Sequence, residues 1–248
     1  MRRGRMGFWY RLAILVVQPL LLMFTKRDWH GRQNLPREGG LIIAINHISH
    51  LDPFTLAHFL YRGHRLPRYL AKSELWSVPF VKWVLAGAGQ IPVHRRTSDA
   101  ALALKDAVAA IERGECLVVY PEGTTTKDPT YWPMVPKTGV ARLALTTGAP
   151  VIPMAQWGVQ DIFGQERKFH LLPRKTVHVS AGPPVDLSAY AGQPLSADVL
   201  RAATDTIMTE VRRLLGELRG ETPPDVAFDP KTAKLADAHT ARDERRTA

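Results

Sequence analysis

Short apolar runs alternate with amphipathic segments along most of the chain. The runs are rich in Val, Ile and Leu, which is typical of buried strands, and between them apolar residues recur every three or four positions, which indicates helices. Several helical segments begin at Ser, Thr or Asp and end at Gly, as helix caps commonly do. We expect strands at 41–45, 68–72, 90–94, 117–120, 151–155 and 176–180, and helices at 52–60, 99–113, 138–147 and 196–219.

This alternation predicts one α/β domain, a sandwich in which helices flank a mixed sheet. A chain of 248 residues with 45% hydrophobic content can bury one sizeable core, and nothing in it demands a second. We place this domain at 31–219. From residue 220 the chain is rich in Pro, Ala and charged residues and lacks apolar patterning, so we expect a disordered tail at 220–248.

The N-terminal segment, 1–30, has the pattern of a membrane anchor. Basic residues precede an aromatic cluster, and a run that is apolar except for Gln18 and Pro19 continues to Phe24. The run is shorter than the roughly 20 residues that cross a bilayer, and its proline interrupts it, so we expect a helical segment embedded in one leaflet. A cleaved signal peptide or an ordinary buried helix would give a similar pattern, although no small-residue cleavage site follows the run.

The formal net charge of +10 predicts an anionic partner, either nucleic acid or an anionic membrane surface. Because the N-terminal arginines border the apolar run and no nucleic-acid-binding module is recognisable, we expect the membrane, with the protein associated with its cytoplasmic face. The single cysteine, Cys116, excludes an intrachain disulfide and fits a reducing compartment, and its apolar neighbours predict a buried structural thiol. The sequence carries no signal for an oligomeric state.

A histidine and a carboxylate lie five positions apart after the first core strand. His47 and Asp52 would point away from each other on one helix, but in a loop between a strand and a helix they can meet. A histidine whose other ring nitrogen is held by a carboxylate can take a proton from an alcohol. Asp52 before Pro53 is also a good N-cap, and a metal site that includes His50 is a third alternative, although no second cluster of ligands follows.

Two further segments carry candidate chemistry. The turn after the strand at 117–120 contains Gly123 and Thr124, and backbone amides and hydroxyls at the end of a strand can bind a phosphate. The segment 73–86 is apolar nearly all round, which fits a helix that lies against the bilayer, lines an acyl pocket or packs in the core.

Four motifs follow one another in a fixed order. They are Asn46-His47 through Asp52, Gly89-Gln90-Ile91-Pro92-Val93-His94-Arg95, Tyr120-Pro121-Glu122-Gly123-Thr124 and Val151-Ile152-Pro153-Met154-Ala155. Together, over about 35–184, they resemble the motifs of the glycerolipid acyltransferases typified by 1-acylglycerol-3-phosphate acyltransferase. Any one of them can arise by chance, whereas four in this order are a specific signal.

The resemblance implies an activity and the residues that carry it. It implies that an acyl group passes from acyl-CoA or acyl carrier protein to the hydroxyl of lysophosphatidate, giving phosphatidate in a membrane, with no cofactor and no metal. It implies that His47 is the general base and that Asp52 orients it. No acyl-enzyme is expected, because the chain offers no evident activated Ser or Cys.

The resemblance also implies how the acceptor is bound. The glycerol phosphate is expected to contact Arg95, the turn Glu122-Gly123-Thr124 and Lys72, and an arginine fork suits phosphate. Glu122 cannot attract a phosphate, so we expect it to orient Arg95 or a substrate hydroxyl.

One position departs from the pattern of the family. Thr125 stands where the third motif usually continues with arginine, so the phosphate contact passes to Lys127 or Lys137, or the acceptor is another lysolipid or a glycolipid. Hydrolysis, as by a thioesterase or lipase, is a further alternative, and the absence of a Gly-x-Ser-x-Gly motif argues against the lipase form. Non-catalytic binding of anionic lipid is the last.

Overall fold

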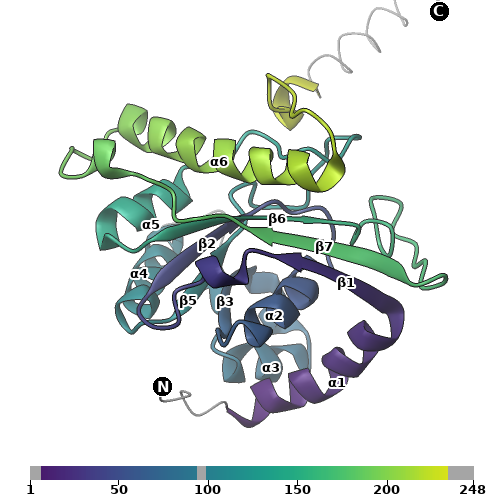
Figure 1. Cartoon of the computed structure of the whole chain (residues 1–248). Coiled ribbons are helices and arrows are strands. Elements are labelled where there is room, and N and C mark those ends of the chain that lie inside the picture. Colours follow the sequence, from purple (N-terminus) through teal and green to yellow (C-terminus); the bar gives the residue numbers. More distant parts are fainter. Residues whose placement is uncertain (1–6, 94–98, 234–248) are drawn as a thin grey trace, which may run out of the picture.

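A mixed sheet of seven strands lies at the centre of the molecule (Figure 1). The computed structural model describes residues 7–93 and 99–233. Neighbouring strands pair in parallel, except that β6 and β7 pair antiparallel. From one edge to the other the strands are β1 (Thr25–His30), β7 (Lys175–Ala181), β6 (Val151–Trp157), β2 (Leu41–Ile45), β5 (Cys116–Val119), β3 (Pro67–Lys72) and β4 (Ile91–Val93).

Helices cover both faces of the sheet. Successive side chains of β2 point to opposite faces, so Ile42 and Ala44 pack in one core and Ile43 and Ile45 in the other. The first core includes α4 (Asp99–Glu112), α5 (Gly139–Thr147) and α6 (Ala197–Arg219), and the second includes α2 (Asp52–Arg62). Next to α2, α1 (Phe8–Phe24) and α3 (Val81–Gly87) contact each other (Figure 1). Short 3-10 helices span Arg32–Asn34, Ser73–Ser77 and Ser188–Tyr190.

The predicted α/β architecture with a mixed sheet is confirmed. All five residues of β2 are buried, as expected for a parallel strand covered on both faces. Gly148 ends α5 with φ 65°, a left-handed conformation that favours glycine. The hydroxyl of Ser196 accepts the amide of Val199 at 3.3 Å and caps α6.

β1 is a strand that the apolar pattern does not predict, and it moves the boundary of the domain. Residues 25–30 belong to the sheet rather than to the anchor expected at 1–30, because each residue of β1 pairs with a residue of β7. Three of its six residues, Lys26, Arg27 and Asp28, are charged. An edge strand tolerates such side chains, so no apolar run marks it in the sequence.

The disorder expected from residue 220 is not found in 220–233. The amide of Val135 donates to the carbonyl of Phe228 at 3.0 Å, and the amide of Glu221 donates to the carbonyl of Gly216 at 3.1 Å. Backbone hydrogen bonds rather than an apolar stripe hold this segment, so hydrophobic patterning does not reveal it. The rest of the expected tail, 234–248, lies outside the described residues.

The apolar segment 73–86 is not one helix. A 3-10 helix is followed by Pro79 and by Phe80, whose φ is 66°, and only then does α3 begin. Proline lacks the amide that a continuous helix would use. Phe80 and Trp83 are 61% and 56% exposed, so the segment does not pack in the core.

α1 is a helix of 17 residues that contains Pro19 and buries none of its side chains. Within residues 7–93 and 99–233, no helix combines the length and the apolar character that are needed to cross a membrane.

Candidate active site

His47 and Asp52 meet at the carboxyl end of β2, in the loop that leads to α2. His47 Nδ1 lies 2.8 Å from Asp52 Oδ2. The same oxygen accepts the amides of Ile48 at 2.6 Å and Ser49 at 2.9 Å. The N-cap alternative for Asp52 is therefore wrong, because the helix is capped by Leu51 and the carboxylate turns back toward the histidine loop.

The surroundings of the pair suit a general base. Asp52 is completely buried, which raises the pKa of its carboxyl, while the hydrogen bonds from His47 and the two amides act in the opposite direction. The His47 side chain is 15% exposed, and its ring stacks on Tyr120 with the centroids 4.1 Å apart. Because Nδ1 faces Asp52, Nε2 is the nitrogen that a substrate hydroxyl can reach.

Glu122 supports the same loop from the other side. Its Oε1 accepts the amide of His47 at 2.9 Å and its Oε2 accepts the amide of Met134 at 3.0 Å. Burial raises the pKa of Glu122 to about 8, although the two amides oppose this. Both carboxylate oxygens therefore fix backbone amides, while the expected role of orienting Arg95, which lies outside the described residues, or a substrate hydroxyl stays a prediction.

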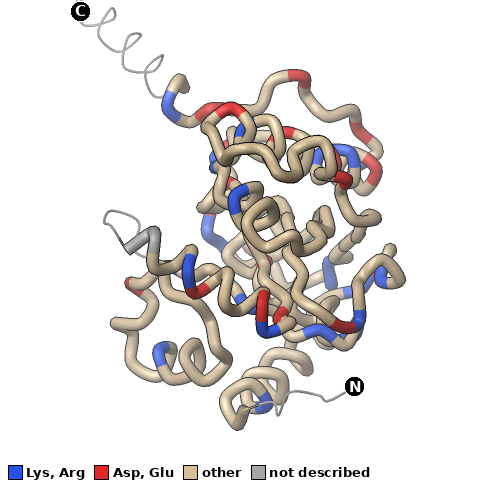
Figure 2. The backbone as a smooth tube through the Cα atoms, turned by 90° about the vertical axis from the view of Figure 1, so that its left-hand side faces the viewer, with Lys and Arg blue, Asp and Glu red and all other residues tan. Residues whose placement is uncertain are grey.

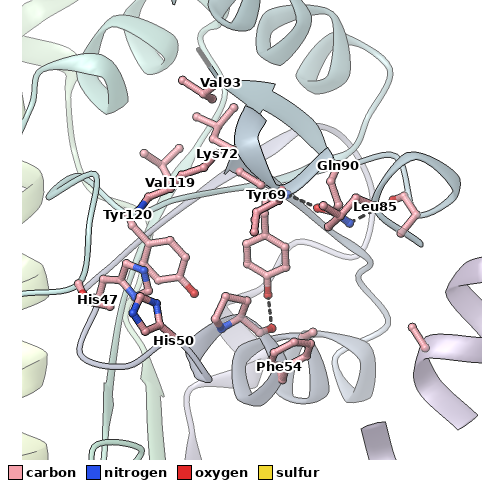
Figure 3. Close-up of a pocket in the computed structure, with 18 of the residues that line it drawn as sticks. His47, His50, Phe54, Tyr69, Lys72, Leu85, Gln90, Val93, Val119 and Tyr120 are labelled. Atoms are coloured by element: carbon pink, nitrogen blue, oxygen red, sulfur yellow. Dashed lines mark hydrogen bonds between the residues drawn. The ribbon is translucent and has the colours of Figure 1, made fainter. Parts of the chain in front are cut away.

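A pocket of about 1030 Å³ lies beside His47. In Figure 3, His47 and His50 lie next to Tyr120 at one side, Phe54 projects from α2, and Leu85 lies across the space. The wall formed by α1, α2 and α3 is largely apolar. The polar wall near His47 consists of Lys72, Gly123, Thr124, Thr125, Lys137 and Thr138.

The structure brings most of the predicted site residues to this pocket. Lys72, Gly123 and Thr124 line it together with His47. Arg95 lies outside the described residues. Of the two lysines considered as replacements for the missing arginine, Lys137 lines the pocket, and its Nζ would lie 2.9 Å from a Cβ on Gly123.

Two further findings bear on the alternatives. Cys116 is buried with a free thiol, as predicted, and burial raises its pKa to about 12. In the part of the chain that the structure describes, no group of three His, Cys, Asp or Glu side chains could hold a metal ion. The metal-site alternative therefore has no set of ligands there.

A family model described as acyltransferase matches residues 26–157, which is more than half of the chain. The chain belongs to this acyltransferase family. The match runs from the second residue of β1 to the end of β6 and therefore includes His47, Asp52 and the polar wall of the pocket.

Two relatives of this acyltransferase are named as 1-acyl-sn-glycerol-3-phosphate acyltransferases. This chain is 30% identical over 171 residues to the 1-acyl-sn-glycerol-3-phosphate acyltransferase of Borreliella burgdorferi, and the aligned region covers 67% of this chain and 66% of that protein. It is 29% identical over 162 residues to a chloroplastic 1-acyl-sn-glycerol-3-phosphate acyltransferase of Brassica napus, covering 64% of this chain and 45% of that protein. The chain thus spans about half to two thirds of the length of these relatives.

A solved structure shares the fold of this acyltransferase. It is the 1-acyl-sn-glycerophosphate acyltransferase of Thermotoga maritima, which matches with a TM-score of 0.63 and 23% identity over 88% of this chain and 86% of that chain. At this identity the similarity establishes the fold.

Two polar residues of the acyltransferase site, Tyr120 and Gln156, are not among the predicted site residues. Tyr120 reads as the end of a strand, yet its ring packs on His47. Gln156 directly follows an apolar run, where a polar side chain is unusual, and its backbone makes two hydrogen bonds with the side chain of Asn46, at 2.9 and 3.0 Å.

Proposed function

We propose that this protein moves a fatty acyl group from acyl-CoA or acyl carrier protein to the hydroxyl of lysophosphatidate, giving phosphatidate. The 2.8 Å contact between His47 and Asp52 at the wall of a pocket that is cationic on one side and apolar on the other carries this proposal. The names of the relatives support the same acceptor.

The reaction needs one base and no covalent intermediate on the chain. His47 Nε2 takes the proton of the acceptor hydroxyl while that oxygen attacks the thioester carbonyl carbon. The tetrahedral intermediate collapses, the carbon–sulfur bond breaks, and the proton on His47 passes to the leaving sulfur. Asp52 holds the ring in the required tautomer and stabilises the imidazolium that forms between these steps. Neither a cofactor nor a metal takes part.

The polar wall is the proposed site for the phosphate of the acceptor. Lys72 and Lys137 bring two positive charges to it, and Gly123 presents its backbone with φ 70° beside the ammonium of Lys137. Lys137 therefore takes the place of the arginine that Thr125 replaces. Arg95 remains a proposed phosphate ligand on the grounds of its motif.

Replacing Lys137 by alanine is expected to raise KM for lysophosphatidate about tenfold with little change in kcat, since a hydrogen bond to a charged group contributes about 1.5–3 kcal/mol. Steady-state transfer rates at varied lysophosphatidate measure this. The matched control is Lys127→Ala, because the Lys127 side chain is exposed and does not line the pocket. Equal effects of the two substitutions, or an equal effect of Lys137→Ala on an acceptor without a phosphate monoester, would count against the assignment.

Association with an anionic membrane surface is the second part of the proposal. α1 and α3 together expose large apolar side chains, and Arg11, Lys26 and Arg27 lie on or directly after α1 and are exposed. In Figure 2 several Lys and Arg residues lie in the lower half of the molecule, which contains the N-terminal helix. This combination is typical of a helix that lies in the membrane interface. The exposed apolar side chains are Phe8, Leu15, Val16, Leu20, Leu22, Met23, Phe80 and Trp83.

Charging the outer face of α1 is expected to weaken membrane binding. The double variant Leu15→Glu, Val16→Glu should reduce the fraction that floats with phosphatidylglycerol-containing vesicles at least about tenfold, because each burial of such a side chain contributes roughly 1.5–3 kcal/mol. Val226→Glu changes a residue that is even more exposed and lies far along the chain, and it should float like the wild type. Unchanged flotation of the double variant would remove α1 from the membrane interface.

A panel of acceptors tests the proposed function as a whole. Purified protein is given labelled palmitoyl-CoA, or palmitoyl acyl carrier protein, with lysophosphatidate, other lysophospholipids or a glycolipid. Lysophosphatidate should be acylated fastest. Faster acylation of another acceptor would keep the reaction and change the substrate, and Thr125, which stands in the polar wall where the family has arginine, would then be the reason.

A further inference from the structure

The hydrogen bonds of Asp52 all fall on one of its two oxygens. Oδ2 accepts from His47, Ile48 and Ser49, whereas Oδ1 is buried and has no partner among the described residues. A buried carboxylate oxygen that has lost water and found no donor costs free energy. A donor for Oδ1 is therefore expected close by.

Two buried donors on segments that contact the His47 loop also lack hydrogen-bond partners. Among the described residues, six buried side-chain polar atoms have no hydrogen-bond partner, and three of them are Asp52 Oδ1, the Tyr120 hydroxyl and Gln156 Nε2. Such atoms are uncommon in folded proteins, and half of those found here belong to residues around one histidine.

Independent contacts place these three groups together. The Tyr120 ring stacks on the His47 ring at an angle of 24° (Figure 3), and Nδ1 of that His47 ring contacts Asp52 Oδ2. The hydroxyl of Thr55 lies 3.1 Å from the backbone oxygen of Asp52 and 3.2 Å from Gln156 Oε1. Because Gln156 Oε1 accepts the hydroxyl of Thr55, Gln156 Nε2 is the part of the amide that can still donate a hydrogen bond.

The charges agree with this placement. Burial first, and then the negative charge of Asp52, raise the pKa of Tyr120 well above its usual range, while the side-chain amide of Gln156, which is close enough to interact with the hydroxyl, lowers it. The phenol therefore stays protonated at neutral pH and keeps a hydrogen to donate.

We propose that Tyr120 and Gln156 are positioning residues that donate to Asp52 Oδ1, directly or through one bound water, and so hold the His47–Asp52 pair from the side opposite to the loop. This rests on the proposed function, because both residues act through His47. A donor on Oδ1 keeps the carboxylate from turning away from the imidazole. It also spreads the negative charge, so the carboxylate does not hold the proton on His47 too firmly to pass it on to the leaving sulfur.

The variant Tyr120→Phe tests the proposal because it keeps the ring on His47 and removes only the hydroxyl. We expect kcat to fall about tenfold with little change in either KM, as for the loss of one hydrogen bond to a charged group. We also expect the acid limb of the pH–rate profile to move to higher pH by about half a unit, because a carboxylate without that donor stabilises the imidazolium more strongly. The other titratable groups around the pair are unchanged by the variant: His50, Lys72, Tyr69 and Glu122.

Gln156→Met should give the same two changes, and the double variant should be less impaired than the product of the single effects, because the residues act on one oxygen. The matched control is Tyr190→Phe, which removes a hydroxyl hydrogen bonded to Thr206 at 2.9 Å, away from the pocket, and should behave like the wild type. A Tyr120→Phe variant with the rate and the pH profile of the wild type would overturn the proposal.

The titration of His47 can also be followed by NMR through its ring protons, without turnover. The same upward shift in Tyr120→Phe is expected there, and its absence would equally overturn the proposal. If the wild type transferred no acyl group to any acceptor, the proposed function would fail, and the NMR titration would still decide whether Tyr120 acts on the pair.

Discussion

Replacing His47 by alanine is expected to lower kcat for acyl transfer by about a thousandfold, within the range of roughly 10²–10⁴ that a positioned general base contributes. The imidazole is the one group at the pocket whose second nitrogen is held by a buried carboxylate, within residues 7–93 and 99–233. Binding of vesicles and the melting temperature should remain close to those of the wild type, because the His47 side chain adds one hydrogen bond to the loop and the backbone contacts stay.

His50 provides the comparison, since it is the other imidazole of the same loop and also lines the pocket. Its pKa is lowered, first by burial and then by the charge of His47, and its ring lies near Phe163 with the centroids 6.3 Å apart. His50→Ala should therefore cost less than about tenfold in kcat. A thousandfold loss in His50→Ala together with an active His47→Ala would assign the base to the wrong histidine and contradict the mechanism.

Replacing Asp52 by asparagine should lower kcat by several hundredfold or more, in the order of the roughly 10⁴ that the equivalent change costs in a serine-protease triad. An amide can still accept the amides of Ile48 and Ser49, so the loop keeps its shape. It carries no charge, however, and cannot stabilise the imidazolium of His47. Rapid-quench measurement of a single turnover, with saturating acceptor, isolates this loss from any change in binding.

The same variant is expected to change how stability depends on pH. Burial raises the pKa of Asp52 in the folded protein, so between its ordinary value and the raised one the folded state binds more protons than the unfolded state. The free energy of unfolding of the wild type then falls as pH rises through that window. Asparagine does not titrate, so Asp52→Asn lacks this pH-dependent contribution. Its free energy of unfolding relative to the wild type, measured by urea titration, should therefore increase with pH. If the difference in free energy of unfolding, variant minus wild type, stayed constant or decreased with pH, folding would not raise the pKa of Asp52.

Local patterns predict much of the fold, because the information for those elements lies within a few residues. The buried run of β2, the glycine that ends α5 and the serine that caps α6 each act on their own segment. β1 escapes prediction because its stability comes from pairing with β7, about 150 residues later, and not from apolar side chains. The break before α3 is indicated by Pro79, whereas the positive φ of Phe80 is a backbone conformation that no propensity indicates.

The candidate site likewise combines contacts that the sequence can predict with contacts that it cannot. His47 and Asp52 are five positions apart, so a single loop is enough to foresee their contact. Glu122 is expected to orient Arg95 or a substrate hydroxyl, and the structure adds a contact with the amide of His47, 75 positions away, which a pattern of residue types cannot specify. Tyr120 follows β5 and Gln156 lies in β6, the two neighbours of β2 in the sheet, so only the order of the strands brings both residues to the segment that follows β2.

The most direct test follows the fate of a labelled acyl group in one reaction. Purified wild-type protein in mixed micelles receives labelled palmitoyl-CoA with and without lysophosphatidate, and the label is then measured in phosphatidate, in free fatty acid and on the denatured chain. Direct transfer from the thioester predicts label in phosphatidate only when the acceptor is present, none on the protein, and no transfer by His47→Ala. Free fatty acid released at the same rate without acceptor, or label bound to the protein, would contradict the central claim that His47 activates the acceptor hydroxyl.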